Sequence, residues 1–278
     1  MKTTLLITTY NWPQALRLVL ESAFIQSVLP NEIVIADDGS GEETRTLIEE
    51  MTAKSPVPLK HVWHEDKGFR KTIVLNSAVA ICLGTYILQV DGDCILSPHY
   101  VEDHIAMSKL GYFAGGKRIV LTEEMTRSTL EEGRLSYSVI GLLRKKKGLR
   151  EVKSLLRLPH LMKWYSERIS RTRAHEMPIA GFSFSFWKKD FVAVNGYDET
   201  MEGWGFEDID IAYRLGMLGI RHTPIRFGGY VFHLWHKTRD LGIPDAENPN
   251  FLKMQTHLTS GTYFAETGYD RHLDRSDF

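Results

Sequence analysis

The chain has 278 residues, 43% of them hydrophobic, which is enough to bury one large α/β core or a core with an appended lobe. A formal net charge of −1 excludes a general binder of nucleic acids or anionic surfaces. The two cysteines, Cys82 and Cys94, are too few for a disulfide framework and lack zinc-finger spacing, so a reducing compartment is expected.

The amino terminus leads directly into a strand pattern. Residues 1–7 have no extended hydrophobic segment of the kind that a signal peptide needs. The sequence also lacks an apolar run of about 18 residues or more, the length of a transmembrane helix. We therefore expect a cytoplasmic protein without a transmembrane span.

The first half of the sequence alternates short apolar runs with segments of helical periodicity. The first helix begins at Pro13, a residue favoured in the first turn of a helix. Strands are expected at 4–10, 32–36, 58–63 and 86–91, and helices at 13–24, 42–51 and 68–82. This alternation with short connections predicts an α/β fold with a mostly parallel sheet, in which ligands bind at the carboxyl ends of the strands.

Three polar clusters stand at the ends of predicted strands. They are Thr-Thr-Tyr-Asn at 8–11, Asp-Asp-Gly-Ser at 37–40 and Asp-Gly-Asp at 91–93. A single loop aspartate is usually a turn former or a helix cap. Because the carboxyl ends of parallel strands meet at one edge, we expect the three clusters to lie on the same rim.

The tripeptide at 91–93 has two interpretations. Two carboxylates at the end of a buried strand repel each other, so they need a cation, a hydrogen-bonding loop or an exposed turn. Mg²⁺ and Mn²⁺ take oxygen ligands and commonly bridge to phosphates, which suits this position. The alternative is an Asp-Gly turn capped by its own side chains.

The alternation ends after about residue 121. A strand is expected at 113–121, and a polar, basic region with helices near 130–143 and 152–170 follows it up to residue 176. Residues 134–173 hold twelve Lys or Arg but only two Glu, and they include the basic run 144–147. This charge is typical of a solvated helical face.

A second interpretation of the basic region is contact with an anionic partner. Apolar side chains between the basic residues would then lie on an anionic lipid surface or over an anionic acceptor. These side chains are Leu155, Leu156, Leu158, Leu161, Met162 and Trp164.

The second half of the sequence contains an acidic turn framed by glycines. After a strand at 177–187 and a short helix at 188–195, the segment 203–215 predicts a helix that starts at Glu207 and Asp208. Acidic residues in a first turn complement the helix dipole, which is a structural explanation. Gly203, Trp204 and Gly205 instead favour a turn that approaches a ligand, with an indole face on which a sugar can stack.

Two histidines follow the last predicted strands. A strand is expected at 220–225, and His233 and His236 lie at the end of another apolar run. Each is either a packed, hydrogen-bonded residue or a metal ligand that joins the aspartates of 91–93. A helix at 251–258 and a peripheral tail complete the chain.

Taken together, four motifs resemble the inverting, nucleotide-sugar-dependent glycosyltransferases of the GT-A fold, specifically glycosyltransferase family 2. The motifs are those at 8–11, 37–40, 91–93 and 203–208, and the resemblance spans about residues 3–236. The second half is similar to the galactosyltransferase-type carboxyl-terminal segment of chondroitin polymerase, β-1,4-galactosyltransferases and polypeptide N-acetylgalactosaminyltransferases.

The resemblance implies a Rossmann-like, mostly parallel sheet flanked by helices, with a carboxyl-terminal acceptor-side segment. It divides the chain into a nucleotide-sugar-binding half at 1–121, a basic helical insertion at 122–176, an acceptor and catalytic half at 177–240, and a carboxyl-terminal helix and tail at 241–278.

The resemblance also implies the site residues and a divalent cation, Mn²⁺ or Mg²⁺. The catalytic base would be Asp208, with Glu207 and Trp204 contacting the acceptor or donor sugar. The nucleotide and its diphosphate would lie against Thr8, Tyr10, Asp38, Arg70, Lys71 and Asp91. Asp93 and His233 would bind the metal, with His236 as the competitor of His233.

Two departures from the family pattern are visible. Gly92 stands where the family often has a bulkier residue, and Phe206 stands where it often has glycine. Phe206 would reshape the sugar pocket, so the identity of the donor sugar stays open.

The implied function is transfer of a hexose or N-acetylhexosamine from a UDP-sugar to a saccharide or lipid-linked acceptor in surface polysaccharide synthesis. Segment 134–173 would then contact the inner face of an anionic membrane, and no nucleic acid would be a partner. These residue types suit the chemistry. Inversion needs a base for the acceptor hydroxyl, which a carboxylate can be. The leaving diphosphate needs positive charge, which a divalent ion and cationic side chains can supply.

Two other functions would use a similar fold. A sugar nucleotidyltransferase usually has a glycine-rich, basic loop after its first strand, but residues 8–13 contain no Gly, Lys or Arg. A non-catalytic carbohydrate-binding module would bind no nucleotide in a metal-dependent way.

Overall fold

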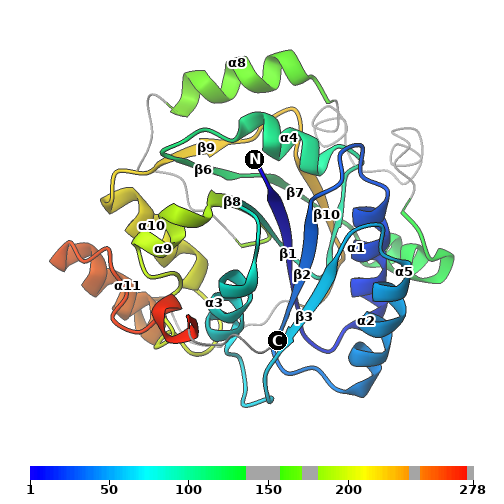
Figure 1. Cartoon of the computed structure of the whole chain (residues 1–278), viewed down its shortest axis with the longest axis horizontal. Helices are drawn as coiled ribbons and strands as arrows, with labels where there is room; N and C mark the ends of the chain where they lie inside the picture. Colours follow the sequence, from blue (N-terminus) through cyan, green and yellow to red (C-terminus); the bar gives the residue numbers. More distant parts are fainter. Residues whose placement is uncertain (136–156, 171–180, 238–244, 274–278) are drawn as a thin grey trace.

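The computed structural model describes residues 1–135, 157–170, 181–237 and 245–273. A seven-stranded sheet forms its centre, with helices on both faces (Figure 1). The strands are β1 (Thr3–Thr9), β2 (Glu32–Asp37), β3 (Leu59–Trp63), β4 (Tyr86–Asp91), β5 (Cys94–Leu96), β6 (Tyr112–Gly115), β7 (Lys117–Val120), β8 (Ser183–Trp187), β9 (Arg221–Pro224) and β10 (Tyr230–His233). The helices are α1 (Pro13–Phe24), α2 (Glu42–Lys54), α3 (Lys71–Ile81), α4 (Tyr100–Met107), α5 (Glu123–Glu132), α8 (Pro159–Ser170), α9 (Lys188–Ala193), α10 (Glu207–Met217) and α11 (Pro249–Ser260), with 3-10 turns η1 (Asp245–Glu247) and η2 (Tyr269–His272).

The strand order of the large sheet is β3-β2-β1-β4-β8-β6-β9. Four neighbouring pairs are parallel and only the two pairs that include β8 are antiparallel, which confirms the predicted α/β class with a mostly parallel sheet. Every residue of β1 and β2 is buried, because helices cover both faces of the sheet.

Alternate side chains of each central strand enter two separate cores. Leu5 and Ile7 of β1 pack with α1 and α2, whereas Leu6, between them, packs with α3 on the opposite face. Period-two side-chain direction explains this division, and burial on both sides explains why these strands are apolar runs rather than alternating ones.

The single strand expected at 113–121 is wrong, because the chain makes two strands there in two different sheets. β6 belongs to the large sheet, whereas β7 pairs with β10 in a small sheet of order β5-β10-β7. Gly116 lies at the break, where a Cβ would come within 2.0 Å of the Ser183 hydroxyl oxygen and 2.7 Å of a backbone carbonyl. Only glycine fits this crossing point.

The basic region is helical in part. The helix expected at 130–143 is wrong in its described part: α5 shares only residues 130–132 with it, and residues 133–135 are not helical. The hydroxyl of Thr122 caps α5 by accepting from the Met125 N–H, and α5 ends at Gly133 in the left-handed conformation. The helix expected at 152–170 corresponds to α8, and the strand expected at 177–187 corresponds to β8. The parts of these predictions at 136–156 and 177–180, with the basic run 144–147, lie outside the described residues.

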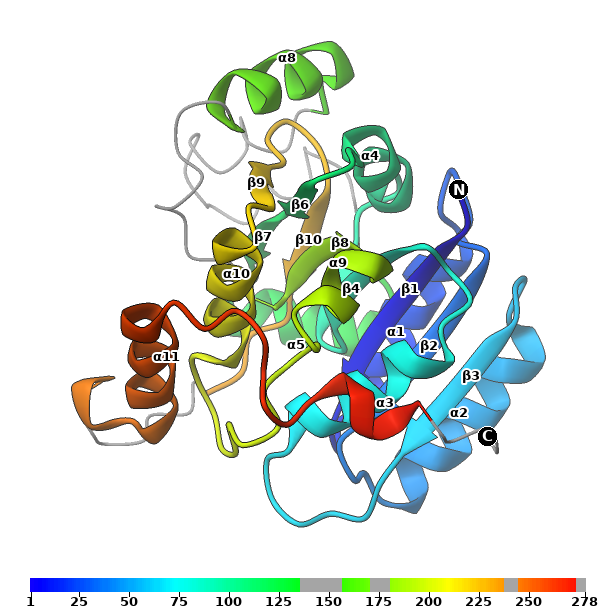
Figure 2. The ribbon, with the colours of Figure 1, turned by 60° about the vertical axis from the view of Figure 1, so that its left-hand side comes forward.

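The expected peripheral tail is also wrong, because its described part belongs to the core. Ala265, Tyr269 and His272 are buried, and η2 lies against α3 (Figure 2). His272 Nδ1 lies 2.9 Å from the hydroxyl of Ser77 on α3. No helix in the described parts of the chain has the length and apolar character needed to cross a membrane.

Candidate active site

The three polar clusters lie on one rim of the sheet, as predicted. Strand register sets Thr8 opposite Asp91 and Thr9 opposite Asp37, and the Thr8 hydroxyl donates to Asp91 Oδ1 at 2.9 Å. A Cβ on Gly92 would lie 2.5 Å from the Thr8 carbonyl oxygen, so the close approach of the β1 and β4 ends explains the glycine.

The loop before α3 folds over Asp38. The backbone N–H of Arg70 donates to Asp38 Oδ2 at 3.1 Å, and His64 Nε2 lies 2.7 Å from Asp38 Oδ1. The Arg70 guanidinium bonds to the carbonyl of Glu65, while its buried Nε has no hydrogen-bond partner among the described residues. Sequence reasoning did not include His64, since nothing in its neighbourhood distinguishes it from an ordinary loop histidine.

Tyr10 stands at the outer edge of this loop. Its ring is 42% exposed, and its hydroxyl donates to Asp66 Oδ2 at 3.0 Å. An exposed aromatic ring at a strand end is free to stack on a flat ligand.

Lys71 connects the first half of the site to the second. Its ammonium lies 3.0 Å from Asp91 Oδ1 and 3.5 Å from Asp208 Oδ2, and its side chain is only 12% exposed. Burial disfavours its charge, but Asp208 and Asp91 outweigh that effect and raise the pKa of Lys71. A charged Lys71 therefore joins two carboxylates that are 117 positions apart in the sequence.

Asp208 is held by groups from three other segments. It accepts from the backbone N–H of Gly181 at 3.0 Å, and Tyr197 Oη lies 3.2 Å from its Oδ1. A Cβ on Gly181 would lie 2.3 Å from Asp208 Oδ2, so this contact requires glycine. Tyr197 is fully buried and also bonds to Gln89 of β4.

Tyr197 is a functional candidate that the sequence did not reveal. The segment 196–198 reads as the stop of a helix, and burial of a tyrosine hydroxyl next to a distant carboxylate leaves no local pattern. Burial and then the nearby charge of Asp208 raise the pKa of Tyr197, so its hydroxyl remains a donor at neutral pH.

Glu207 and Asp208 open α10, as predicted, but in different surroundings. Glu207 is 4% exposed, and its Oε2 accepts from the Gly205 N–H at 3.0 Å. Burial and then the charge of Asp208 raise the pKa of Glu207 to about 7. Glu207 is therefore protonated in a fraction of the molecules at neutral pH.

The turn before α10 presents Trp204 at the surface. The indole is 46% exposed, between Gly203 at φ 82° and Gly205 at φ 106°. Phe206 also has a left-handed backbone, at φ 69°, and its ring meets Phe251 of α11 edge-on at 5.1 Å between centroids. A left-handed phenylalanine costs about 1–2 kcal/mol, so the α11 contact offsets local strain.

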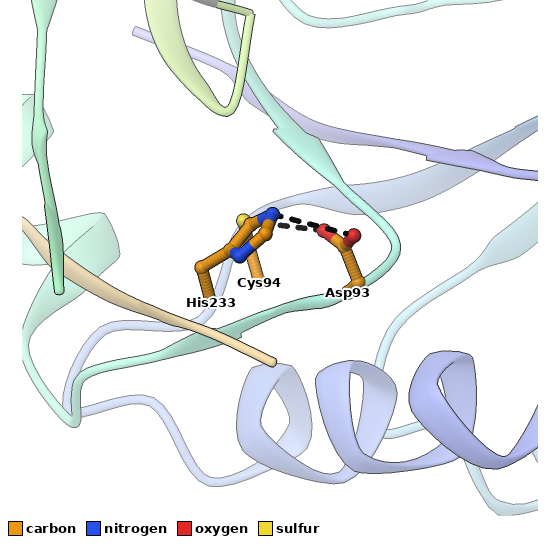
Figure 3. A group of neighbouring side chains, drawn as sticks. All are labelled: Asp93, Cys94 and His233. Atoms are coloured by element: carbon orange, nitrogen blue, oxygen red, sulfur yellow. Dashed lines mark hydrogen bonds and ion pairs between the residues drawn. The ribbon is translucent and has the colours of Figure 1, made fainter. Parts of the chain in front are cut away.

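A carboxylate, a thiol and an imidazole meet on the small sheet (Figure 3). β10 pairs with β5 so that His233 faces Cys94, next to Asp93, and one potential ligand atom from each lies within 4.8 Å of the others. His236 Nε2 is 3.3 Å from Asp93 Oδ2, and His233 Nε2 is 3.5 Å from it. Both candidate histidines are thus near Asp93.

The donor set fits a divalent cation. Burial lowers the pKa of His233, which favours the neutral, ligating imidazole, and in the described part of the chain its buried Nδ1 has no hydrogen-bond partner. The hydrogen bond to Asp93 instead raises the pKa of His236, whose side chain is 41% exposed. Burial raises the pKa of the Cys94 thiol, so oxygen and nitrogen are the donors here, as Mn²⁺ prefers.

Two family patterns match the sequence. Glycosyl transferase family 2 matches residues 4–192, and the N-terminal domain of galactosyltransferase matches residues 169–237. The first pattern therefore covers more than half of the chain.

Characterised proteins with similar sequences include two enzymes. Validoxylamine A glucosyltransferase of Streptomyces hygroscopicus subsp. limoneus is 27% identical over 235 residues, which are 80% of this chain and 49% of that protein. Chondroitin synthase of Pasteurella multocida (strain Pm70) is 25% identical over 243 residues, 83% of this chain and 24% of that protein. The chain spans about half the length of the first relative and about a quarter of the second.

The fold is also found in solved structures. The crystal structure of GalNAc-T7 with UDP, GalNAc and Mn²⁺ has a TM-score of 0.59 and 15% sequence identity to this chain. The match covers 91% of this chain and 47% of the other. This likeness shows that the two share a fold.

Proposed function

The chain belongs to glycosyltransferase family 2 and has a GT-A-type fold, and from this premise we propose an inverting, metal-dependent transfer of a hexose or N-acetylhexosamine from a UDP-sugar to an acceptor hydroxyl. The observation that carries the proposal is the ammonium of Lys71, which lies between Asp91 and Asp208. It joins the proposed diphosphate side of the site to the proposed base.

The nucleotide would lie along the rim formed by the β1, β2 and β4 ends. Tyr10 offers an exposed ring for the uracil, and Thr8, Asp38 and Asp91 lie at or next to the ends of β1, β2 and β4. Asp38 is already oriented by His64 and by the Arg70 N–H, which makes its position independent of a ligand. The support from relatives is the UDP in the GalNAc-T7 structure.

In the proposed mechanism, Asp208 acts as the general base. The acceptor oxygen forms a bond to the anomeric carbon while the bond from that carbon to the diphosphate oxygen breaks, and the hydroxyl proton moves to Asp208. The Gly181 N–H and Tyr197 hold the carboxylate in one orientation, and Lys71 stabilises its negative charge. The nearly buried Glu207, which carries a proton in part of the molecules, would bond to a sugar hydroxyl.

The leaving diphosphate needs positive charge, which this chain supplies from two directions. Asp93 and His233, with His236 as the alternative, would hold Mn²⁺ or Mg²⁺; when bound, such an ion neutralises charge that develops on the diphosphate. Lys71 and Arg70, at the start of α3, would be the second source of positive charge.

For the acceptor we propose a saccharide or lipid-linked saccharide of a surface polysaccharide pathway. Exposed Leu161 and Trp164 alternate with Lys163 and Arg168 on α8, a composition that suits the surface of an anionic membrane. Cosedimentation with phosphatidylglycerol vesicles, compared with phosphatidylcholine vesicles, tests this location; equal recovery in both pellets would contradict it.

Thermal unfolding tests the proposed function. UDP together with Mn²⁺ is expected to raise the melting temperature, whereas UDP with a chelator is not; at a concentration 100 times Kd the stabilisation is about 2.7 kcal/mol. Asp93→Ala should lose the shift, and Asp245→Ala, on the exposed turn η1, should keep it.

Enzyme activity separates a transferase from a binding module. Release of UDP from a panel of UDP-sugars is expected for at least one donor. Metal-dependent UDP binding without any donor cleavage would favour a non-catalytic module, and absence of UDP binding would contradict the whole proposal.

A further inference from the structure

The backbone of the Trp204 turn is held by side chains from α11. Asn250 Nδ2 donates to the Gly203 carbonyl at 3.2 Å and to the Gly205 carbonyl at 3.0 Å. Asn248 Nδ2 lies 3.3 Å from the Trp204 carbonyl. Two buried asparagines thus bind three consecutive carbonyl groups, which is more than a chance contact between a helix and a loop.

The turn needs such support because its own sequence does not restrict it. Gly203 and Gly205 have positive φ, and glycine has more conformational freedom to lose than any other residue. Within the turn, the Gly205 N–H bonds to Glu207. The asparagines therefore act on the segment that carries both Trp204 and the first residues of α10.

α11 is itself fastened to α10. His257 Nδ1 lies 2.7 Å from Asp210 Oδ1, and the other oxygen of Asp210 accepts from Arg214 at 2.7 Å, where both side chains are fully buried. These contacts join the carboxyl-terminal half of α11 to α10, the helix that begins with Glu207 and Asp208. The two asparagines therefore bind the turn from the start of a helix that is itself joined to α10.

α11 also lies beyond both family patterns, which end at residues 192 and 237. We infer that Asn248 and Asn250 are positioning residues that fix the Trp204 indole for stacking against a pyranose acceptor, and so set acceptor affinity. This inference rests on the proposed transferase function, since it assigns an acceptor subsite to that same rim.

Substitutions at Asn248 and Asn250 can separate the hydrogen bonds to the turn from the capping of α11. Asn248 Oδ1 also caps α11 by accepting from the Asn250 N–H at 2.9 Å. Asn248→Asp keeps this capping oxygen but removes the Nδ2 donor, so it isolates the bond to the turn. Asn250→Ala removes both bonds, and Asn250→Ser keeps one hydroxyl donor and should restore part of the effect.

The first measurement is steady-state transfer to p-nitrophenyl glycosides of glucose, galactose and their N-acetylamino forms. In Asn250→Ala the KM for the glycoside is expected to rise about tenfold or more with kcat reduced less, because a displaced stacking ring weakens acceptor binding. Hydrolysis of the UDP-sugar by water should fall less than transfer to the glycoside. Thr256→Ala, on the exposed side of α11, is the matched control.

The second measurement does not depend on activity. With 5-fluorotryptophan at the six tryptophans, the resonance lost in Trp204→Phe identifies Trp204. That resonance should shift or broaden in Asn250→Ala and Asn248→Asp while the other resonances stay in place. An unchanged Trp204 resonance and an unchanged glycoside KM would overturn the positioning role.

The two proposals fail in different ways. A parallel loss of hydrolysis and transfer in Asn250→Ala would contradict acceptor positioning and indicate general damage to the site. If the unmodified protein cleaves no UDP-sugar, the transferase proposal fails, and the fluorine spectra still decide whether the asparagines hold the turn.

Discussion

At the scale of single residues, Glu207 and Asp208 are neighbours in different surroundings, and we propose different roles for them. Asp208 receives an N–H and lies beside Lys71 and Tyr197, whereas Glu207 is almost fully buried and has its pKa raised to about 7 by burial and by Asp208. A buried carboxyl with a raised pKa costs stability when it ionises. Its presence at the start of α10 therefore favours a functional explanation over a stabilising helix-dipole one.

The stability of Glu207→Gln tests this cost. The pKa is 4.5 for the free side chain and about 7 in the folded protein, so folding takes up a proton and stability falls as pH rises between these values. Because glutamine does not ionise, the variant is expected to be about 1–3 kcal/mol more stable at pH 8 and little changed at pH 4. Denaturant unfolding at both pH values measures this.

Glu202→Gln, at an exposed position, is the control for Glu207→Gln. If Glu207→Gln is less stable than the unmodified protein at pH 8, the raised pKa of Glu207 is contradicted. Transfer activity should also fall in Glu207→Gln, since glutamine cannot take both the protonated and the ionised form of the carboxyl group.

Several site residues could be predicted because they follow a strand end or begin a helix. Asp91, Asp93 and Asp208 all occupy such positions, which sequence periodicity reveals. Tyr197 and His64 could not be found this way. Their partners, Asp208 and Asp38, come from other segments, and only the folded chain brings them together.

At the scale of elements, α10, which begins with Glu207 and the proposed base Asp208, packs against α11. Asp210, buried between Arg214 and His257, ties the two helices together. Removal of the imidazole would leave one buried carboxylate oxygen of Asp210 without this hydrogen-bond partner, which costs stability. The sequence predicted both helices but contained no signal that they pack together.

The pH dependence of His257 tests this pairing. The hydrogen bond to Asp210 raises the pKa of His257, so its stabilising effect is complete below about pH 6.5 and is lost as pH rises through the folded value. His257→Gln should therefore cost about 1–2 kcal/mol at pH 6 and less at pH 9. Chemical denaturation of both proteins at each pH gives the comparison.

His160→Gln, on the exposed surface of α8, is the matched control for His257→Gln. A cost that stays constant or grows from pH 6 to pH 9 would contradict the charged pair between His257 and Asp210.

Two elements differ from expectation for a common reason. The run at 113–121 has continuous strand character, yet Gly116 meets Ser183 and the chain changes sheets there. The polar tail contains Tyr269 and His272, which enter the core beside α3. In both cases long-range packing overrides a local pattern.

At the scale of the whole molecule, two halves of the chain build one site. The ends of the parallel strands β1, β2 and β4 form the side that we propose binds the nucleotide, and the later segment contributes Asp208 and His233. The shared rim followed from the regular strand-helix alternation. The small sheet that brings His233 to Asp93 could not be predicted from this alternation, because β5 has only three residues and pairs with a strand far along the chain.

The central claim is that Asp93 serves nucleotide binding through a metal whereas Asp208 serves the proton transfer. Calorimetric titration of UDP in the presence of Mn²⁺, together with the transfer rate, measures both roles in Asp93→Ala and Asp208→Asn. We expect Asp93→Ala to lose metal-dependent UDP binding, and Asp208→Asn to bind UDP within about threefold of the unmodified protein while transfer falls by a factor of about 10²–10⁴. Near-normal transfer by Asp208→Asn, or unchanged metal-dependent binding by Asp93→Ala, would contradict this division of roles.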